Sequence, residues 1–480
     1  MADYTIEELE RWDTRIRALV QEFGLAPCPQ EFEICDSAQM LGYMAYSGMP
    51  SHYPHWSYGK AYEKLKTLYD HGVSGLPYEM VINSDPSLAY LMRDNSLCLQ
   101  IITMAHVYAH NDFFRNNFTF KTTRPEFTIS TFKAHAERIR SYIEDPSIGL
   151  EKVESILDAA HAVSLQCRRN LAVRKLGRPE HEERLLEAAQ APPDPFRRIH
   201  KPTQYTAPDL HKVPIVPEED LLPFIAEHNP YLAAWERDIL GIVHEEAQYF
   251  IPQIETKIMN EGWASYWHKR ILDALELPEG LHLEFLVRHN QVVRPIPGSI
   301  NPYHIGLSLW QHLATRTGEA APAAADAPAP APVPADSPPP ESIFQVRETD
   351  RDTSFLRRFL TEELARELDL IRYEPKGEEL VVTHISDEEG WQQVKETLLR
   401  NVGMGQVPVI KIEDADFGHT RTLYLRHHHD GRDLQLESGE KTLGYLHRLW
   451  GHDVAVETVV NGKRTLLSVS ERGFSAKSLK

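Results

Sequence analysis

Hydrophobic side chains recur at helical spacing in several segments of the first 316 residues. Near the start, Thr5 and Glu8 form a capping-box pattern, and the apolar positions that follow fall on one face. These features predict a helix over residues 5–23. The same spacing predicts three further helical regions, which are residues 96–114, 130–175 and 217–276, the last broken near Pro252. This part of the chain is therefore expected to be mainly α.

Segments without helical periodicity lie between the predicted helices. Residues 37–60 contain a stretch rich in Gly, Pro, His and aromatic side chains, Ser47–Trp56, which predicts a loop. Residues 83–86 predict a helix start, because Pro86 suits the first turn of a helix. Residues 176–216 carry many prolines and charges with little periodicity, so we expect a surface excursion there.

A change in composition divides the chain. Residues 317–341 are mostly Ala and Pro and contain no Lys or Arg, which predicts an extended, semi-stiff linker. Strand-like segments follow at residues 379–385, 407–412, 422–425 and 454–458, with helices predicted over about 387–400 and 440–449. The sequence therefore predicts a mainly helical domain over residues 1–316 and a small α+β domain over residues 342–480.

Composition and charge narrow the class of protein. The chain has 480 residues, of which 42% are hydrophobic, so we expect more than one globular domain. Its 51 basic and 70 acidic residues give a net charge of −19, which argues against a general binder of nucleic acid or anionic membranes. We find no signal-peptide pattern, and no uncharged run reaches the roughly 18 residues of a membrane helix. We expect a cytoplasmic protein with four reduced cysteines, Cys28, Cys35, Cys98 and Cys167.

Two segments far apart in the chain predict the halves of one metal site. His106 and His110 are four residues apart on a predicted helix, so both imidazoles point the same way and can bind one ion. Glu261, on a second predicted helix, can supply a third ligand, as in zinc hydrolases with an open fourth position. The alternative is structural: two core histidines with ordinary partners, and a glutamate paired with Arg138 or Arg140.

Three further side chains are candidates for acid–base chemistry. His268 lies two turns from Glu261 on the same apolar face, and Asp112 follows the histidine pair and could orient it. Glu246 shares a face with apolar residues, where desolvation would raise its pKa. A helix-to-helix ion pair is the alternative for Glu246. Gly262, beside Glu261, would let another backbone come close.

Other chemical motifs are weaker. Three adjacent histidines, His427–His429, precede the turn sequence Asp430-Gly431, and this pattern predicts that they lie on the surface. The sequence contains no Walker loop, no dinucleotide-binding glycine fingerprint after a strand and no nucleophile elbow. The candidate metal site is thus the main pointer to chemistry.

Five segments carry a resemblance to a known family. They are Glu33–Asp36, Met40–Pro50, His106–His110, Lys257–Ala264 and Ile300–Tyr303. On these segments the chain resembles the stage V sporulation protein R (SpoVR) family over most of residues 5–315. That family is linked to spore cortex formation and also occurs in bacteria that form no spores. The resemblance implies two partners, a PrkA-type serine kinase and a von Willebrand A-like protein.

The segment Asn260–Ala264 also resembles the part of gluzincin peptidases that supplies their third zinc ligand. Their first two ligands lie in a His-Glu-x-x-His motif, in which the glutamate is the general base. Here Val107 occupies the position of that glutamate. The resemblance therefore implies the same three ligands and a base from elsewhere, for which His268, Asp112 and Glu246 are the candidates.

These features predict a metal-dependent hydrolase. One divalent transition metal, zinc first, would be held by His106, His110 and Glu261, and the substrate would be an amide-type bond of a peptide or peptidoglycan precursor. Two alternatives stay open. One is a non-catalytic regulatory or assembly factor in a kinase-linked sporulation or stress pathway. The other is an iron enzyme with a two-histidine, one-carboxylate site.

Overall fold

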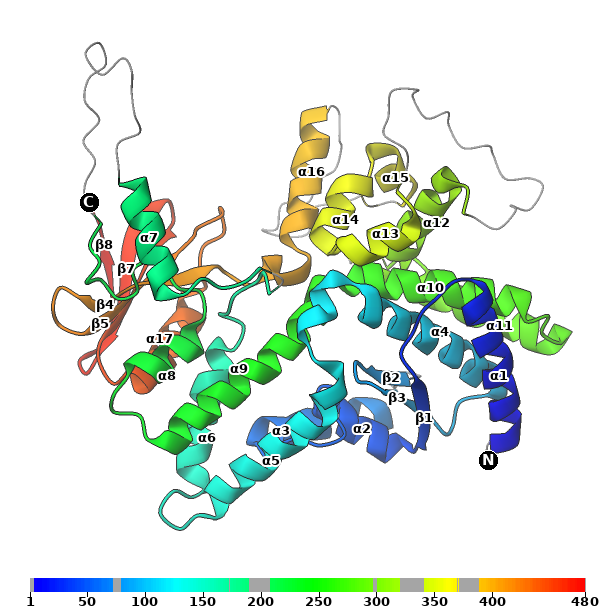
Figure 1. The fold of residues 1–480 in the computed structure, drawn as a ribbon, viewed down its shortest axis with the longest axis horizontal. Coiled ribbons are helices and arrows are strands. Elements are labelled where there is room, and N and C mark those ends of the chain that lie inside the picture. Colours follow the sequence, from blue (N-terminus) through cyan, green and yellow to red (C-terminus); the bar gives the residue numbers. More distant parts are fainter. Residues whose placement is uncertain are drawn as a thin grey trace. The chain divides into compact units, whose positions relative to one another are not determined.

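The structure is a computed structural model that describes residues 4–71, 79–171, 173–189, 208–296, 300–319, 341–368, 370 and 388–479. The chain folds into two compact units, both drawn in Figure 1. The first unit contains residues 1–138 and 249–406, and the second contains residues 139–248 and 407–480. Within the described parts of the chain, no helix combines the length and apolar character needed to cross a membrane.

The first unit is mainly helical. Its helices are α1 (Ile6–Glu22), α2 (Ser37–Ala45), α3 (Trp56–Asp70), α4 (Leu97–Asn116), α10 (Lys257–Ala274), α11 (Glu279–Val293), α12 (Pro302–Thr317), α13 (Ile343–Thr349), α14 (Asp352–Phe359), α15 (Glu362–Glu367) and α16 (Glu388–Arg400). Helices α4 and α10 pack against each other at the centre of the hydrophobic core, with α1 and α11 also against α4 and α12 against α10. The core is therefore organised around the two helices predicted to carry the metal ligands.

Helix α4 begins where the sequence predicts. The Ser96 side chain accepts a hydrogen bond from the Leu99 N–H and caps the helix. Every residue from Cys98 to Phe114 is buried, so this helix is enclosed on all sides rather than on one face. Polar side chains on such a helix must find partners inside the protein.

A small sheet completes the first unit. Its strands are β1 (Gln30–Cys35), β2 (Glu79–Ile82) and β3 (Ser87–Met92), in the order β1-β3-β2. Strand β1 runs parallel to β3, and β2 runs antiparallel to it. Leu91 of β3 belongs to the core that α4 and α10 share, so the sheet supports those helices.

The second unit is α+β. Its helices are α6 (Leu150–Val163), α7 (Arg178–Ala188), α8 (Leu221–His228) and α17 (Leu436–Trp450), and its strands are β4 (Ile410–Phe417), β5 (Thr422–His427), β6 (Val454–Val460), β7 (Lys463–Ser470) and β8 (Gly473–Ser478). The strands form one sheet in the order β4-β5-β6-β7-β8, with β5 and β6 parallel and the other neighbours antiparallel. Helix α17 links the parallel pair and packs on β6 and β7. Two further helices, α5 (Thr128–Glu144) and α9 (Ala234–Glu255), have residues in both units.

The fold class predicted from the sequence is confirmed. Helices α1 and α4 match the predictions for residues 5–23 and 96–114 closely. The C-terminal part has the predicted α+β character, with strands at two predicted positions, 422–425 and 454–458. The strand predicted at 379–385 and all but the ends of the Ala/Pro-rich segment lie outside the described residues.

The loop predicted over Ser47–Trp56 is confirmed. It joins α2, which a capping box between Asp36 and Gln39 starts, to α3, which begins at Trp56. The helical region is also interrupted near Pro252, although Pro252 itself lies inside α9 and the interruption falls at Thr256. One local prediction was wrong: residues 83–86 do not start a helix but connect β2 to β3, whose apolar residues pair with strands on both sides.

Helices α13 to α16, which follow the Ala/Pro-rich segment, group with the first unit. Helix α13 packs against α4 and α12, and α14 packs against α10 and α16. Within the predicted surface excursion, residues 178–188 form α7, and residues 190–207 lie outside the described part. Helices α13 and α14 thus lie against the two central helices, in the same compact unit.

Candidate metal centre

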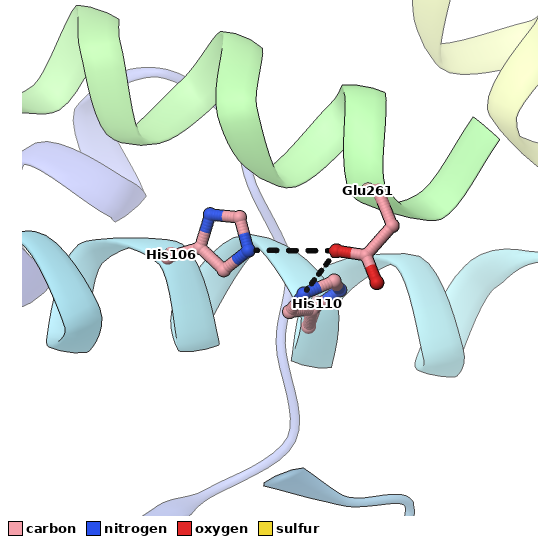
Figure 2. A group of neighbouring side chains, drawn as sticks. All are labelled: His106, His110 and Glu261. Atoms are coloured by element: carbon pink, nitrogen blue, oxygen red, sulfur yellow. Dashed lines mark ion pairs between the residues drawn. The ribbon is translucent and has the colours of Figure 1, made fainter. Parts of the chain in front are cut away.

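Helices α4 and α10 bring the two halves of the predicted site together. His106 and His110 lie one turn apart on α4, and Glu261 faces them from α10 (Figure 2). All three side chains are buried. Among the described residues, they are the one group of three or more His, Cys, Asp or Glu side chains whose ligand atoms lie within 4.8 Å of one another. We call them the three-ligand cluster.

One oxygen lies at the centre of the three-ligand cluster. Oε2 of Glu261 is 3.4 Å from Nε2 of His110 and 3.7 Å from Nε2 of His106. Both distances exceed the normal length of an N–H···O hydrogen bond, and Oε2 is buried without a hydrogen-bond partner. A buried carboxylate oxygen in this state costs free energy. The arrangement therefore favours a cation between the three side chains.

The spacing fits a small metal ion. Zinc binds imidazole nitrogen and carboxylate oxygen at roughly 2.0–2.2 Å, so two donors on a tetrahedral ion lie about 3.3–3.6 Å apart. The separations of 3.4 and 3.7 Å in the cluster are close to that range. Three protein donors leave a fourth position for water or substrate, which is the pattern of a catalytic rather than a structural zinc site.

Both histidines have a partner on the ring nitrogen that faces away from the cluster. Nδ1 of His110 lies 2.8 Å from Oδ1 of Asn260, and Nδ1 of His106 lies 2.8 Å from Nδ1 of His268. Since an amide oxygen only accepts, Nδ1 of His110 carries a proton and a neutral ring keeps its lone pair on Nε2. A partner of this kind orients a metal-binding imidazole and fixes its tautomer.

Glu261 is held in its charged form. Burial by itself would raise its pKa, but the imidazoles of His106 and His110 that face the carboxylate, and the charge of Lys257, hold the pKa well below its usual value. The Lys257 ammonium lies 3.0 Å from Oε1, the second oxygen. The Lys257 side chain is 61% exposed, whereas that of Glu261 is 10% exposed. Lys257 therefore marks the side on which solvent approaches the cluster.

His268 reaches the cluster through His106. Its Nδ1 faces His106, and its Nε2 lies 2.8 Å from Nδ1 of His289 on α11. Burial, followed by the neighbouring His106 and His289, lowers the pKa of His268 well below its usual value. Burial also lowers the pKa of His289 to about 4. Both rings are therefore neutral at neutral pH.

Asp112 is engaged away from the cluster. The Arg347 guanidinium donates to both carboxylate oxygens at 2.8 Å, and the Trp263 indole N–H and the Ala26 backbone N–H donate as well. Burial raises the pKa of Asp112, and the Arg347 charge and these donors oppose the rise. Asp112 thus joins α4, α10 and α13. The partners of the two histidines are instead Asn260 and His268.

Glu246 is buried on α9, in the second unit, and is not a member of the three-ligand cluster. In the same unit, His427 is buried with Nδ1 2.8 Å from the Thr458 hydroxyl, and His429 pairs with Asp433 at 2.9 Å. The prediction of surface histidines is therefore wrong for His427, whose buried side chain contacts Thr458 of the neighbouring strand.

Sequence reasoning did not find four residues that bind the side chains of the candidate site residues. Asn260 and Lys257 lie one and four residues before Glu261, and the i,i+4 spacing could have pointed to Lys257. Arg347 lies beyond the Ala/Pro-rich segment, and His289 lies on another helix. For these two the sequence carries no local signal, because only tertiary packing makes them neighbours.

Comparison with known proteins covers nearly the whole chain. Residues 3–407 match the family described as "SpoVR like protein", and residues 408–461 match the SpoVR-like C-terminal domain. The chain is 32% identical over 481 residues to "Uncharacterized protein YcgB" of Escherichia coli (strain K12), covering 95% of this chain and 92% of that protein. No solved structure matches the chain. With both family regions matched and a relative that aligns over nearly its full length, the chain belongs to the SpoVR family.

Proposed function

We propose that this protein is a metal-dependent hydrolase that binds one divalent transition metal, zinc first, at His106, His110 and Glu261. One observation carries the proposal: Oε2 of Glu261 is buried without a hydrogen-bond partner. It lies 3.4 and 3.7 Å from two imidazole nitrogens, close to the separation of two donors bound to one zinc ion. Two core histidines and a glutamate with purely structural roles would close these gaps with direct hydrogen bonds near 2.9 Å.

The donor spacing favours zinc over iron. An iron site of the two-histidine, one-carboxylate type has donors on one face of an octahedron, which at bonds of about 2.1 Å lie about 3.0 Å apart. The two separations in the structure, 3.4 and 3.7 Å, are closer to the tetrahedral value. A zinc ion held by His106, His110 and Glu261 would supply a Lewis acid that polarises a carbonyl group and makes a bound water molecule more acidic.

The protein's own groups set the rest of the chemistry. Burial keeps the three-ligand cluster at low dielectric, which strengthens its electrostatic interactions. Lys257, exposed and 3.0 Å from Oε1 of Glu261, would face negative charge that develops on an acyl oxygen during attack. Asn260 and His268 hold the two imidazoles in orientation. This combination suits hydrolysis of an amide-type bond in a peptide or peptidoglycan precursor.

Metal content tests the proposal first. Purified wild-type protein, incubated with zinc and then desalted, should retain about one zinc per chain by elemental analysis. His106→Ala and His110→Ala should lose it, and His71→Ala, which changes an exposed histidine, should not. Circular dichroism would establish that each variant is folded. Folded wild-type protein that takes up no zinc would overturn the proposal.

Hydrolysis is tested on zinc-loaded protein. Release of free amines from peptides and peptidoglycan stem peptides should require zinc, stop with a chelator and return when zinc is added back. His110→Ala should be inactive and His71→Ala active. Protein that retains one zinc per chain but releases no amine from either substrate class would keep the metal centre and reject the hydrolase.

A further inference from the structure

A line of three histidines runs from the three-ligand cluster through the core to α11. His106 contacts His268 through the two Nδ1 atoms at 2.8 Å, and Nε2 of His268 contacts Nδ1 of His289 at 2.8 Å. All three rings are buried. Both separations are hydrogen bonds, so in each bond one nitrogen carries the proton and the other accepts it.

With all three imidazoles neutral, the two hydrogen bonds along the line can point in only two directions. A neutral imidazole has one donor and one acceptor nitrogen. If Nδ1 of His106 donates, His268 accepts on Nδ1 and donates from Nε2, and His289 accepts on Nδ1 and carries its proton on Nε2. If Nε2 of His106 carries the proton, every bond in the line points the other way. The tautomer of His106 therefore fixes the tautomer of His289.

The occupant of the three-ligand cluster selects one order. Oε2 of Glu261 lies 3.7 Å from Nε2 of His106 without a direct hydrogen bond, and its negative charge favours a proton on that nitrogen when no ion is present. A ligand nitrogen must instead offer a lone pair, which places the His106 proton on Nδ1. The two conditions require opposite orders of the same line.

We propose that His268 and His289 are positioning residues that hold His106 in its metal-binding tautomer, and that zinc binding reverses the order of the line, moving the His289 proton from Nδ1 to Nε2. This inference rests on the proposed metal centre. It assigns to His289, a residue that touches none of the three ligands, a state that reports whether the cluster is filled.

The proton balance of the reversal is complete. His106 loses its Nε2 proton to solvent at the cluster and takes the shared proton from Nδ1 of His268. His268 takes the shared proton from Nδ1 of His289, and His289 takes one proton from solvent on Nε2. Each ring has one proton before and after, and solvent gives one and receives one.

The surroundings of His289 fit this assignment. Lys269 and Asp273 form an ion pair at 2.7 Å, both partly exposed, and their charges act on His289. In the proposed reversal, His289 takes its Nε2 proton from water on the side of this partly exposed ion pair. Phe285 packs against both His268 and His289 and keeps the rings in an apolar setting, which favours neutral forms.

The test is nitrogen NMR of histidine-labelled protein during zinc titration, with zinc stoichiometry measured separately by elemental analysis. The spectrum of His289→Gln identifies the His289 signals. In wild type, one equivalent of zinc should move the His289 proton from Nδ1 to Nε2. In His268→Phe the His289 signals should not respond, and zinc affinity should fall about 10- to 100-fold, the usual effect of losing a partner of a metal-binding histidine.

Two variants separate positioning from general support of the fold. His268→Gln keeps one acceptor and one donor, so it should hold zinc affinity within about threefold of wild type by preserving the His106 partner. His282→Gln, a change on the same helix as His289, should leave affinity and the His289 signals unchanged. If one zinc binds per chain without any change in the His289 signals, the proposed reversal of the histidine line is wrong and the metal centre is still supported. No zinc bound would overturn both.

Discussion

Gly262 on α10 and Gly306 on α12 meet backbone to backbone. A Cβ added at Gly262 would lie 2.3 Å from the carbonyl carbon of Gly306, and one added at Gly306 would lie 2.2 Å from the Ile258 carbonyl oxygen. No side chain fits between two helices at this distance. The sequence prediction that Gly262 lets another backbone come close is confirmed, and the contact lies next to Glu261.

Gly262→Ala should therefore disturb both stability and the metal centre. The new methyl group meets backbone, which cannot rotate away, so we expect a loss of about 3 kcal/mol in the free energy of unfolding, the upper end of the range for overpacking. Zinc affinity should fall as well, because α10 must move with Glu261. Urea unfolding and zinc titration measure the two effects.

Gly59→Ala is the matched control, because Gly59 lies in α3 with nothing within 4 Å of an added Cβ. There the change should raise stability by roughly 0.5–1 kcal/mol through helix propensity. Equal stability of wild type and Gly262→Ala would show that α12 is free to shift.

Asn260 should control zinc affinity through His110. Asn260→Ala removes the acceptor that holds Nδ1 of His110 at 2.8 Å, so we expect affinity to fall about 10- to 100-fold without loss of the fold. Asn260→Asp keeps an acceptor at the same place and should restore most of the affinity. Calorimetric zinc titration gives the values.

Asn290→Ala, at an exposed position on α11, is the control and should bind zinc as wild type does. Unchanged affinity in Asn260→Ala would mean that packing alone orients His110.

The ligand helices could be predicted from the sequence because their signals are local. His106 and His110 share a helical face by their spacing, and the Ser96 cap fixes where that helix starts. What joins the two helices is not local. Arg347 reaches Asp112 across 235 positions of sequence, and Asp352 reaches Ile258 across 94. Such contacts depend on how whole helices pack against one another, which the hydrophobic periodicity of the sequence does not indicate.

Removing one partner of the Arg347–Asp112 ion pair should strongly lower the free energy of unfolding. Both side chains are almost fully buried, so Arg347→Met leaves a carboxylate with no charge partner, and we expect a loss of about 3–5 kcal/mol. The double variant Arg347→Met with Asp112→Leu should recover much of this loss, because it removes both buried charges. Denaturant unfolding provides the comparison.

Arg366→Met serves as the control, because the Arg366 side chain is 59% exposed and that of its partner Glu362 is 25% exposed. Its effect should stay below about 1 kcal/mol. A loss of similar size in both arginine variants would contradict a special role for the buried pair.

Asp352 should give the first unit a pH-dependent stability. Its carboxylate accepts from the Ile258 and Met259 N–H groups at 2.9 Å and caps α10 just before Glu261. Burial raises its pKa to about 8, against roughly 3.9 in an unfolded chain. The folded state therefore binds the Asp352 proton more tightly than the unfolded state. This contribution is complete below about pH 4 and is lost as pH rises toward 8.

Asp352→Asn removes that titration. Urea unfolding, followed by tryptophan fluorescence, should show wild type losing more stability than Asp352→Asn between pH 5 and 8. The variant should also carry a constant penalty of about 1–3 kcal/mol, because its NH₂ group cannot accept from the second N–H. Asp145→Asn is the control: Asp145 is exposed and hydrogen bonds from Ser147 lower its pKa, so its contribution changes only below that range. Parallel slopes for wild type and Asp352→Asn would show that the two N–H groups keep Asp352 ionised throughout.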